Sequence, residues 1–360
     1  MVLMYFTFKK MKKLLTISIL FLAIAFSCKK EKVEETTYKP TPYSIRVPAH
    51  FPIPEIPAVN PMTVEGVTLG KKFYYDPILS SNGLTCSSCH IANKSYSTPL
   101  FINSTGDYIS VPPHVNLAWN PDYNWNGSEP KLDHLCIADF GPDFFDTDMD
   151  KLVLDLKAHA DYPDMIYKAF GVTDVAQLTH DELKQTIVYS ISQFMRSMVS
   201  ADSKFDKYFD HQVGFTASEQ SGYMIFMTER GDCFHCHGNP LFTSNDFRNN
   251  GLDCTPQGQN MGRYLVTGNA NDIGKFSVPT LRNVELTAPY MHDGRYSTLE
   301  EVVEYYNSGV CMTSPNIDPI MTKPAKEYGL NLWPWEKEDL VNFLKTLTDT
   351  TFINNPDYRN

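Results

Sequence analysis

Apolar residues recur at helical spacing in several separate stretches of the chain, and capping residues precede most of these stretches. Thr179-His-Asp-Glu182 is a capping box, and an apolar stripe runs behind it from Leu183 to Met198. Thr216-Ala-Ser-Glu219 and Thr298-Leu-Glu-Glu301 open two further helices in the same way. The pattern also predicts helices over about 148–159, 165–170 and 336–347.

The remaining pattern is irregular. The alternation that is typical of strands is almost absent, and five prolines lie from Pro48 to Pro61. Such a segment is extended, because proline removes a backbone donor and disfavours helix in the residue before it. Glycine, proline and asparagine interrupt the chain from Thr63 to about Phe145. The sequence therefore predicts a mainly α protein with long loops.

The first 27 residues have the pattern of an export signal. Four lysines precede an apolar run from Leu14 to Phe26, which is shorter than the roughly 20 residues of a membrane-spanning helix. Ala25-Phe26-Ser27-Cys28 resembles a bacterial lipoprotein box, in which the cysteine carries lipid. We expect a signal peptide over 1–27, lipid on Cys28 and a flexible tether over 28–48. This predicts a periplasmic or cell-surface lipoprotein of a Gram-negative bacterium.

Charge narrows the range of partners. The 360 residues carry a net charge of −11, and removal of residues 1–27 takes away four lysines and no acidic residue, which leaves −15. An acidic surface disfavours nucleic acid and anionic lipid and favours basic soluble partners. Membrane contact is therefore expected through the lipid alone. The length suggests two domains.

Two segments carry the strongest chemical signal. Cys86-Ser-Ser-Cys89-His90 and Cys233-Phe-His-Cys236-His237 both match C-x-x-C-H, the attachment signature of c-type haem. Cysteines at this spacing reach both vinyl groups on one edge of the porphyrin, and the next histidine lies beneath the iron. A zinc site needs two cysteine pairs about 12–20 residues apart, but 143 residues separate these pairs. We therefore expect two haem c groups, with His90 and His237 as iron ligands.

Three cysteines have no assignment from these motifs. Cys136, Cys254 and Cys311 allow one disulfide and leave one thiol, and their spacing does not choose the pair.

With two such motifs, the chain resembles the bacterial dihaem cytochrome c peroxidases and their MauG-type relatives. The resemblance extends from about residue 50 to 350. It is strongest over 278–283, 287–295 and 298–303, and residues 196–206 match the connector between the family's domains. It implies cytochrome c-like domains over 49–200 and 201–350, each around one covalently bound haem, followed by a tail over 351–360. The first haem would be peroxidatic and the second would be the electron entry site.

The resemblance also implies ligands for the second haem. Fourteen residues after His292, where the peroxidases carry a methionine ligand, stands Tyr306, and MauG-type proteins carry a tyrosine there. A phenolic ligand stabilises oxidised iron and lowers its potential relative to methionine. We expect Tyr306 to be the sixth ligand. The alternatives are Met291, Met312 and Met321.

At the first haem the resemblance is incomplete. The displaceable histidine of the classical peroxidases maps to Asp107, and His114 is the first histidine after His90. This predicts an open distal site that binds peroxide without reductive activation. The family's distal glutamate maps to Asp148, with Asp143 and Asp146 as alternatives.

Two further residue sets follow from the resemblance. Trp125 matches the tryptophan between the haems, and Ala138 replaces the family's distal glutamine. The calcium site of the family uses two backbone carbonyls, which map to Thr287 and Pro289, and an asparagine that maps to Ser110. Calcium is therefore a second expected cofactor.

Three functions remain as hypotheses. The leading one is a peroxidase that reduces hydrogen peroxide with electrons from a small cytochrome or cupredoxin through the C-terminal haem. The second is a MauG-like enzyme that oxidises protein side chains, and the third is a dihaem electron-transfer lipoprotein without turnover. The sequence leaves the oligomeric state open, including a homodimer.

Overall fold

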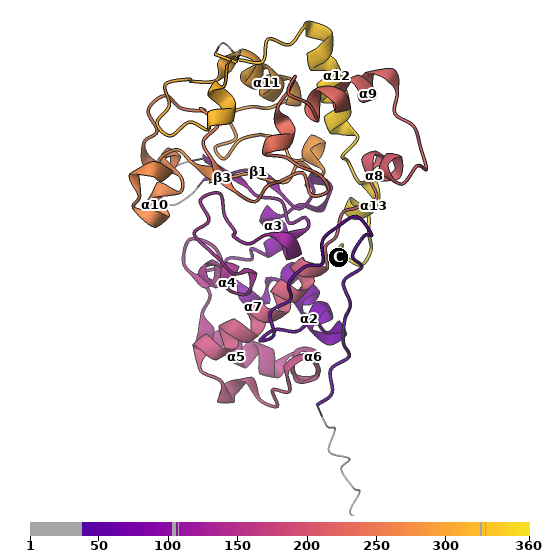
Figure 1. Ribbon diagram of the computed structural model, residues 1–360. Coiled ribbons are helices and arrows are strands. Elements are labelled where there is room, and N and C mark those ends of the chain that lie inside the picture. Colours follow the sequence, from indigo (N-terminus) through magenta and orange to yellow (C-terminus); the bar gives the residue numbers. More distant parts are fainter. Residues whose placement is uncertain (1–37, 103–105, 107, 325, 328) are drawn as a thin grey trace, which may run out of the picture. The chain divides into compact units, whose positions relative to one another are not determined.

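The protein is mainly helical, and its computed structural model describes residues 38–102, 106, 108–324, 326, 327 and 329–360. The predicted signal peptide, Cys28 and most of the predicted tether lie outside the described residues. Helices α2 and α4–α7 gather in one lobe, and α9, α11 and α12 gather in another (Figure 1). Among the described residues, none of the helices has the length and apolar character needed to span a bilayer.

Each lobe combines a few long helices with several of one or two turns. The first lobe contains α2 (Val64–Tyr75), α3 (Cys86–Cys89), α4 (Leu132–Leu135), α5 (Met149–Ala158), α6 (Tyr162–Phe170) and α7 (His180–Ser197). The second contains α8 (Lys204–Phe209), α9 (Ala217–Phe226), α10 (Tyr264–Thr267), α11 (Leu299–Glu304) and α12 (Pro334–Lys345), and α13 (Thr350–Ile353) follows. Two antiparallel pairs complete the structure: β1 (Thr98–Ile102) with β2 (Tyr108–Val111), and β3 (Phe247–Arg248) with β4 (Phe276–Ser277).

Each lobe has its own hydrophobic core. The first core collects buried residues between Leu69 and Met198, and the second collects buried residues between Phe205 and Leu347. Phe352 and Tyr358, from the segment expected to be a tail, pack into the first core. The last residues of the sequence therefore pack against the N-terminal lobe.

A glycine allows close approach of the main helix pair in each lobe. In the first lobe, a Cβ on Gly70 of α2 would lie 1.9 Å from the carbonyl oxygen of Ser190 in α7. In the second lobe, a Cβ on Gly222 of α9 would lie 1.9 Å from the carbonyl oxygen of Asp339 in α12. The two lobes thus repeat one arrangement, in which a helix before the C-x-x-C-H motif crosses a later helix at a glycine.

The capping predictions are confirmed, whereas the long helix α2 and the short helices α3, α4, α8, α10 and α13 were not predicted. The boxes at Thr179, Thr216 and Thr298 begin α7, α9 and α11, and Asp148 caps α5. The sequence pattern gave no helix near residue 64, where α2 forms. Its two glycines weaken the helical signal, because they are selected for packing against α7 rather than for helix propensity.

Candidate functional site

Each C-x-x-C-H motif ends in a histidine whose ring is held by a backbone carbonyl. His90 Nδ1 donates to the carbonyl oxygen of Tyr96 at 2.8 Å, and His237 Nδ1 donates to that of Phe242 at 3.1 Å. Burial lowers the pKa of both histidines to about 4. Each ring is therefore neutral with its proton on Nδ1, which leaves the Nε2 lone pair free to bind a metal.

The first motif opens into a cavity of about 750 Å³, which includes Cys86, Cys89 and His90 in its lining. Neither cysteine is in a disulfide. Both thiols and the Nε2 of the histidine are thus available on one side of an internal space. This donor set fits a c-type haem, which needs two thioether bonds and an axial imidazole.

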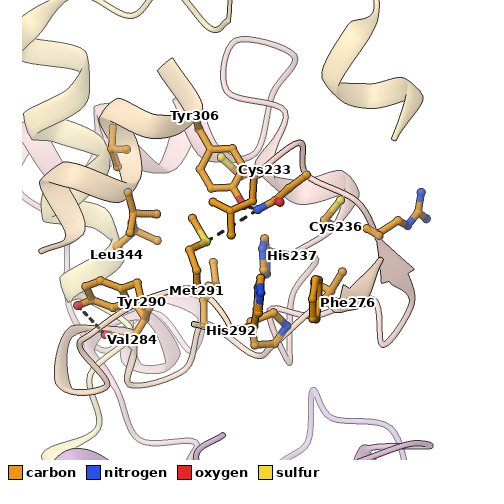
Figure 2. A pocket seen from close by; sticks show the side chains of 18 of the residues that line it. Cys233, Cys236, His237, Phe276, Val284, Tyr290, Met291, His292, Tyr306 and Leu344 are labelled. Carbon is orange, nitrogen blue, oxygen red and sulfur yellow. Dashed lines mark hydrogen bonds between the residues drawn. The ribbon is translucent and has the colours of Figure 1, made fainter. Parts of the chain in front are cut away.

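The second motif opens into a cavity of about 250 Å³ with the same donor set, Cys233, Cys236 and His237, in its lining. Here too the cysteines are outside any disulfide. Figure 2 shows Tyr306 and Met291 pointing into this cavity together with His237. The residues present therefore fit a second c-type haem.

Tyr306 lies in a five-residue π-helical turn, Tyr305–Gly309, that continues α11. Such turns are rare and occur frequently at functional sites. The Asn250 side-chain amide donates to Tyr306 Oη at 3.1 Å and contacts Met291 Sδ at 3.8 Å. Burial raises the pKa of Tyr306 to about 12. Tyr306 and the alternatives Met291, Met312 and Met321 all line the cavity, so the assignment of the sixth ligand stays a prediction.

Trp125 lines both cavities. Its indole Nε1 donates to the carbonyl oxygen of Ser110 at 2.6 Å, which fixes the ring in the wall between them. Phe276 and His292 line both cavities as well, and their rings stack at 3.7 Å with an interplanar angle of 13°. The two candidate haem sites therefore share an aromatic wall.

His114 lies beside His90 rather than across the first cavity from it. The two rings stack at 3.4 Å and 18°, and His114 Nδ1 hydrogen-bonds with the Tyr74 hydroxyl at 3.1 Å. If His90 holds a haem iron, a ring stacked on it would lie on the same side of the porphyrin rather than at the peroxide-binding face. Asp107, the position of the family's displaceable histidine, lies outside the described residues.

The acidic residues near the first cavity have different surroundings. Asp148 is exposed, and its carboxylate accepts the Lys151 backbone N–H at 3.0 Å as the N-cap of α5. Asp148, Asp143 and Asp146 are not among the residues that line the cavity. Asp139 does line it, and burial raises its pKa to about 6. Asp139 was not among the residues predicted from the sequence, although it directly follows Ala138 at the family's glutamine position.

The residues expected to bind calcium lie near the shared wall. Ser110 Oγ donates to the carbonyl oxygen of Pro289 at 3.4 Å, and the Ser110 backbone N–H donates to the carbonyl oxygen of His292 at 2.9 Å. Thr287 and Pro289 line the second cavity. The structure thus brings Ser110 and Pro289 together, and calcium binding itself stays a prediction.

The pairing of the remaining cysteines is resolved. Cys254 and Cys311 form a disulfide, and Cys136 is free and buried. The disulfide joins the loop after Asn250 to the segment after the π-helical turn, where the Cys311 backbone N–H also donates to the Gly251 carbonyl oxygen. It therefore fastens the Asn250 loop to the segment that carries Tyr306.

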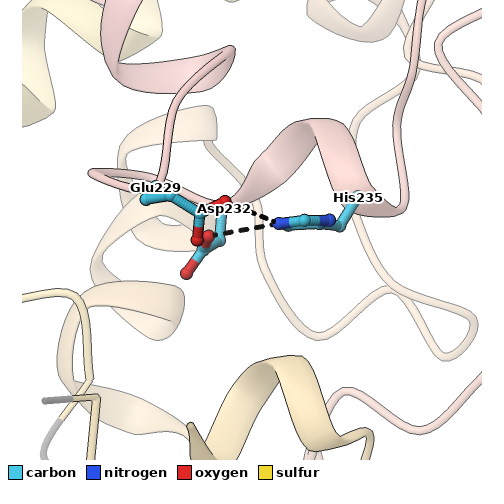
Figure 3. A group of neighbouring side chains, drawn as sticks. All are labelled: Glu229, Asp232 and His235. Carbon is cyan, nitrogen blue, oxygen red and sulfur yellow. Dashed lines mark hydrogen bonds and ion pairs between the residues drawn. The ribbon is translucent and has the colours of Figure 1, made fainter. Parts of the chain in front are cut away.

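Glu229, Asp232 and His235 gather beside the second motif (Figure 3). His235 Nε2 lies 3.2 Å from Glu229 Oε1 and 3.6 Å from Asp232 Oδ1. Lys323 pairs with both carboxylates, and Lys326 pairs with Asp232 at 2.9 Å. Two ammonium groups already neutralise the carboxylates, so the group acts as an ion-pair cluster that holds the loop of the second C-x-x-C-H motif. His235 is turned to this cluster.

The same arrangement, a cysteine pair followed by a histidine held by a backbone carbonyl, occurs twice around one aromatic wall. This arrangement is typical of a c-type cytochrome with two haem sites. The family model for di-haem cytochrome c peroxidase matches residues 64–214. Cytochrome c551 peroxidase of Nitrosomonas europaea is 32% identical over 272 residues, which cover 71% of this chain and 77% of that protein. The chain therefore belongs to the di-haem cytochrome c peroxidase family, which also includes MauG, and it is an oxidoreductase.

Two further relatives carry the MauG name. The methylamine utilization protein MauG of Methylorubrum extorquens is 29% identical over 300 residues, which cover 81% of this chain and 80% of that protein. A crystal structure of a MauG-like protein associated with microbial copper homeostasis is 31% identical, with a TM-score of 0.75. The alignment covers 88% of this chain and 98% of that one. Membership of the family implies two c-type haems in this chain.

Proposed function

We propose that this protein is a dihaem peroxidase that reduces hydrogen peroxide to water with electrons from a small redox protein. The observation that carries the proposal is the pair of adjoining cavities, each lined by a cysteine pair and a carbonyl-held histidine, with Trp125 in both linings. A haem c in each cavity supplies the iron at which peroxide binds and electrons are exchanged. The N-terminal site, over residues 49–200, would be peroxidatic, and the site over 201–350 would receive electrons.

The residues of the first cavity have separate tasks in this reaction. Neutral His90 would bind the haem iron through Nε2, while its Nδ1–H donates a hydrogen bond to the Tyr96 carbonyl oxygen. Cleavage of the O–O bond requires a proton to move between the two peroxide oxygens, which a carboxylate with a pKa near the working pH can assist. Asp139 has that pKa and lines the cavity. Trp125, in the shared wall, carries electrons between the two sites.

Asp148 is the competing candidate for this proton transfer, since the resemblance assigns it the role. Its capping bond to Lys151 and its exposure favour a structural role instead. The variants Asp139→Asn and Asp148→Asn separate the two assignments. The variant that slows the reaction with peroxide identifies the acid–base group.

A second candidate function is a MauG-like oxidation of protein side chains. The position of Tyr306 in a π-helical turn of the second cavity supports it. A tyrosine ligand stabilises oxidised iron, so peroxide could oxidise the protein without prior reduction. A sulfur-to-iron charge-transfer band in the oxidised protein would contradict the Tyr306 ligand and favour one of the methionines.

The test is peroxide consumption by the haem-loaded protein with a reduced small cytochrome or cupredoxin as donor. Sustained consumption supports the peroxidase. Little consumption, together with a new modification on a co-expressed partner protein, supports the MauG-like function. If the protein exchanges electrons with the donor but neither consumes peroxide nor modifies a partner, it is an electron-transfer protein and both enzymatic proposals fail.

We further propose that the protein is exported and held at a membrane only by lipid on Cys28, which lies outside the described residues. The leader pattern of residues 1–27 supports this. Metabolic labelling with a fatty acid should mark the wild type and not Cys28→Ala. Equal labelling of both would contradict the assignment.

A further inference from the structure

Three tyrosines form a continuous line of rings that begins in the second cavity. The ring centroids of Tyr306 and Tyr305 lie 5.1 Å apart, and those of Tyr305 and Tyr296 lie 5.5 Å apart. Tyr306 lines the cavity, Tyr305 is 4% exposed and Tyr296 is half-buried. The line therefore runs from the candidate iron ligand, through a buried ring, to a ring that reaches solvent.

The middle and the outer tyrosine differ in where a phenol proton can go. Tyr305 donates its hydroxyl proton to the carbonyl oxygen of Asn250 at 2.9 Å, and a backbone carbonyl cannot accept that proton outright. An oxidised Tyr305 would thus retain an unfavourable positive charge in a buried site. Tyr296 reaches solvent and can release its proton to water. A one-electron oxidation that enters the line is therefore stable at Tyr296 and only transient at Tyr305.

We propose that Tyr306, Tyr305 and Tyr296 form a relay that carries one-electron oxidation from the C-terminal cavity to the surface, which makes Tyr296 a second site of oxidation chemistry. The relay rests on the proposed function, since it requires haem in the cavities and peroxide as the oxidant. In each step one electron leaves the Tyr296 phenol inward and its proton goes to water, which gives a neutral phenoxyl radical. A partner's phenol or indole then returns an electron and a proton to Tyr296, and a second oxidation follows. Two such cycles supply the two electrons that convert one hydrogen peroxide, with two protons, into two waters.

The chemistry of Tyr296 defines what this site oxidises. A phenoxyl radical is quenched by an electron and a proton from another electron-rich aromatic side chain, so the substrate class is an exposed phenol or indole. Charged groups surround the position, since Arg295 pairs with Asp293 and with Asp253. A partner would therefore bring a tyrosine or tryptophan to a polar surface rather than to an apolar groove.

The test treats the haem-loaded protein with peroxide in the presence of a nitroso spin trap and locates the adducts by peptide mass spectrometry. The wild type should carry the adduct on Tyr296, and Tyr296→Phe should lose it. Tyr305→Phe keeps the packing but removes the intermediate phenol, so it should lose the Tyr296 adduct while the haem absorbance still responds to peroxide. Tyr223→Phe is the matched control, because Tyr223 is a half-buried tyrosine of the same lobe that does not line the cavity.

The outcomes separate the relay from the function on which it rests. A Tyr296 adduct that persists unchanged in Tyr305→Phe would overturn the relay, and so would a normal haem response without any adduct on Tyr296. A haem absorbance that does not respond to peroxide would overturn the proposed function and the relay with it. Loss of the adduct in Tyr305→Phe, with retention in Tyr223→Phe, would support the relay.

Discussion

The ion pair between Asp206 and Arg282 is a sensitive point in the C-terminal lobe. The guanidinium of Arg282 is fully buried and donates to both carboxylate oxygens, at 2.8 and 2.9 Å, and to the carbonyl oxygen of Pro240. Asp206 also accepts from the backbone N–H and hydroxyl of Ser203. Pro240 follows His237 by three residues, so the pair anchors the loop that carries the second C-x-x-C-H motif.

The substitution Asp206→Asn should cost about 3–5 kcal/mol of unfolding free energy, which is the usual effect of removing one partner of a buried ion pair. The side-chain exposure is 0% for Arg282 and 3% for Asp206, so solvent does not screen the interaction. In the variant an amide NH₂ replaces one carboxylate oxygen. Two hydrogen-bond donors, this NH₂ and the Arg282 guanidinium, then face each other without an acceptor between them. The matched control is Asp155→Asn, whose ion pair with Lys151 is solvent-exposed and should cost less than about 1 kcal/mol.

The measurement is equilibrium denaturation of the haem-loaded proteins, followed by haem absorbance and circular dichroism. Burial alone would raise the pKa of Asp206, but the hydrogen bonds and charge of Arg282 and the bonds from Ser203 bring it below its usual value. A lowered carboxyl pKa adds stability above the unfolded pKa of about 3.9, and this stability is lost as pH falls through the folded pKa. The difference between wild type and Asp206→Asn should therefore shrink below about pH 4. An effect no larger than that of Asp155→Asn at neutral pH would refute the reasoning.

Three other substitutions or treatments test separate parts of the structure. Gly70→Ala should destabilise the N-terminal lobe by about 1–3 kcal/mol or more in thermal melts, because its Cβ meets a backbone carbonyl, whereas Gly214→Ala meets open space and should be neutral. Reduction of the Cys254–Cys311 disulfide, which closes a loop of 57 residues, should lower the unfolding free energy by about 4 kcal/mol, and an unchanged melting temperature would contradict this. With the pKa of Asp139 raised to about 6, the rate of reaction with peroxide should rise as pH increases through 6, where the carboxylate forms and can accept a proton. Asp139→Asn should flatten this stopped-flow profile, and a profile that keeps its inflection would exclude Asp139 as the base.

The features that could be predicted are those that depend on residues close together in the sequence. The capping boxes at Thr179, Thr216 and Thr298 and the C-x-x-C-H motifs are local patterns, so the helix starts appear where expected. Helix α2 was missed because its glycines serve a contact with α7, which lies more than a hundred residues away in the chain.

The candidate site was only partly predictable for the same reason. The pairing of Cys254 with Cys311 depends on how two distant loops approach each other, which spacing does not encode. The sequence alone does not distinguish Asp139 from Asp148. In the structure, Asp139 lines the first cavity and Asp148 caps helix α5. The relay through Tyr305 and Tyr296 depends likewise on ring contacts that form only in the folded chain.

The return of the chain end to the N-terminal core limits how the protein can be divided. Tyr358 packs in that core and donates its hydroxyl to the Ser197 carbonyl oxygen, while Lys71 donates to the carbonyl oxygen of Pro356. A fragment that stops at residue 200 would expose the apolar surface that Phe352 and Tyr358 cover. The N-terminal lobe thus reaches its final form only after residue 358 has been synthesised, so the Cys86 motif lies in an incomplete lobe until then.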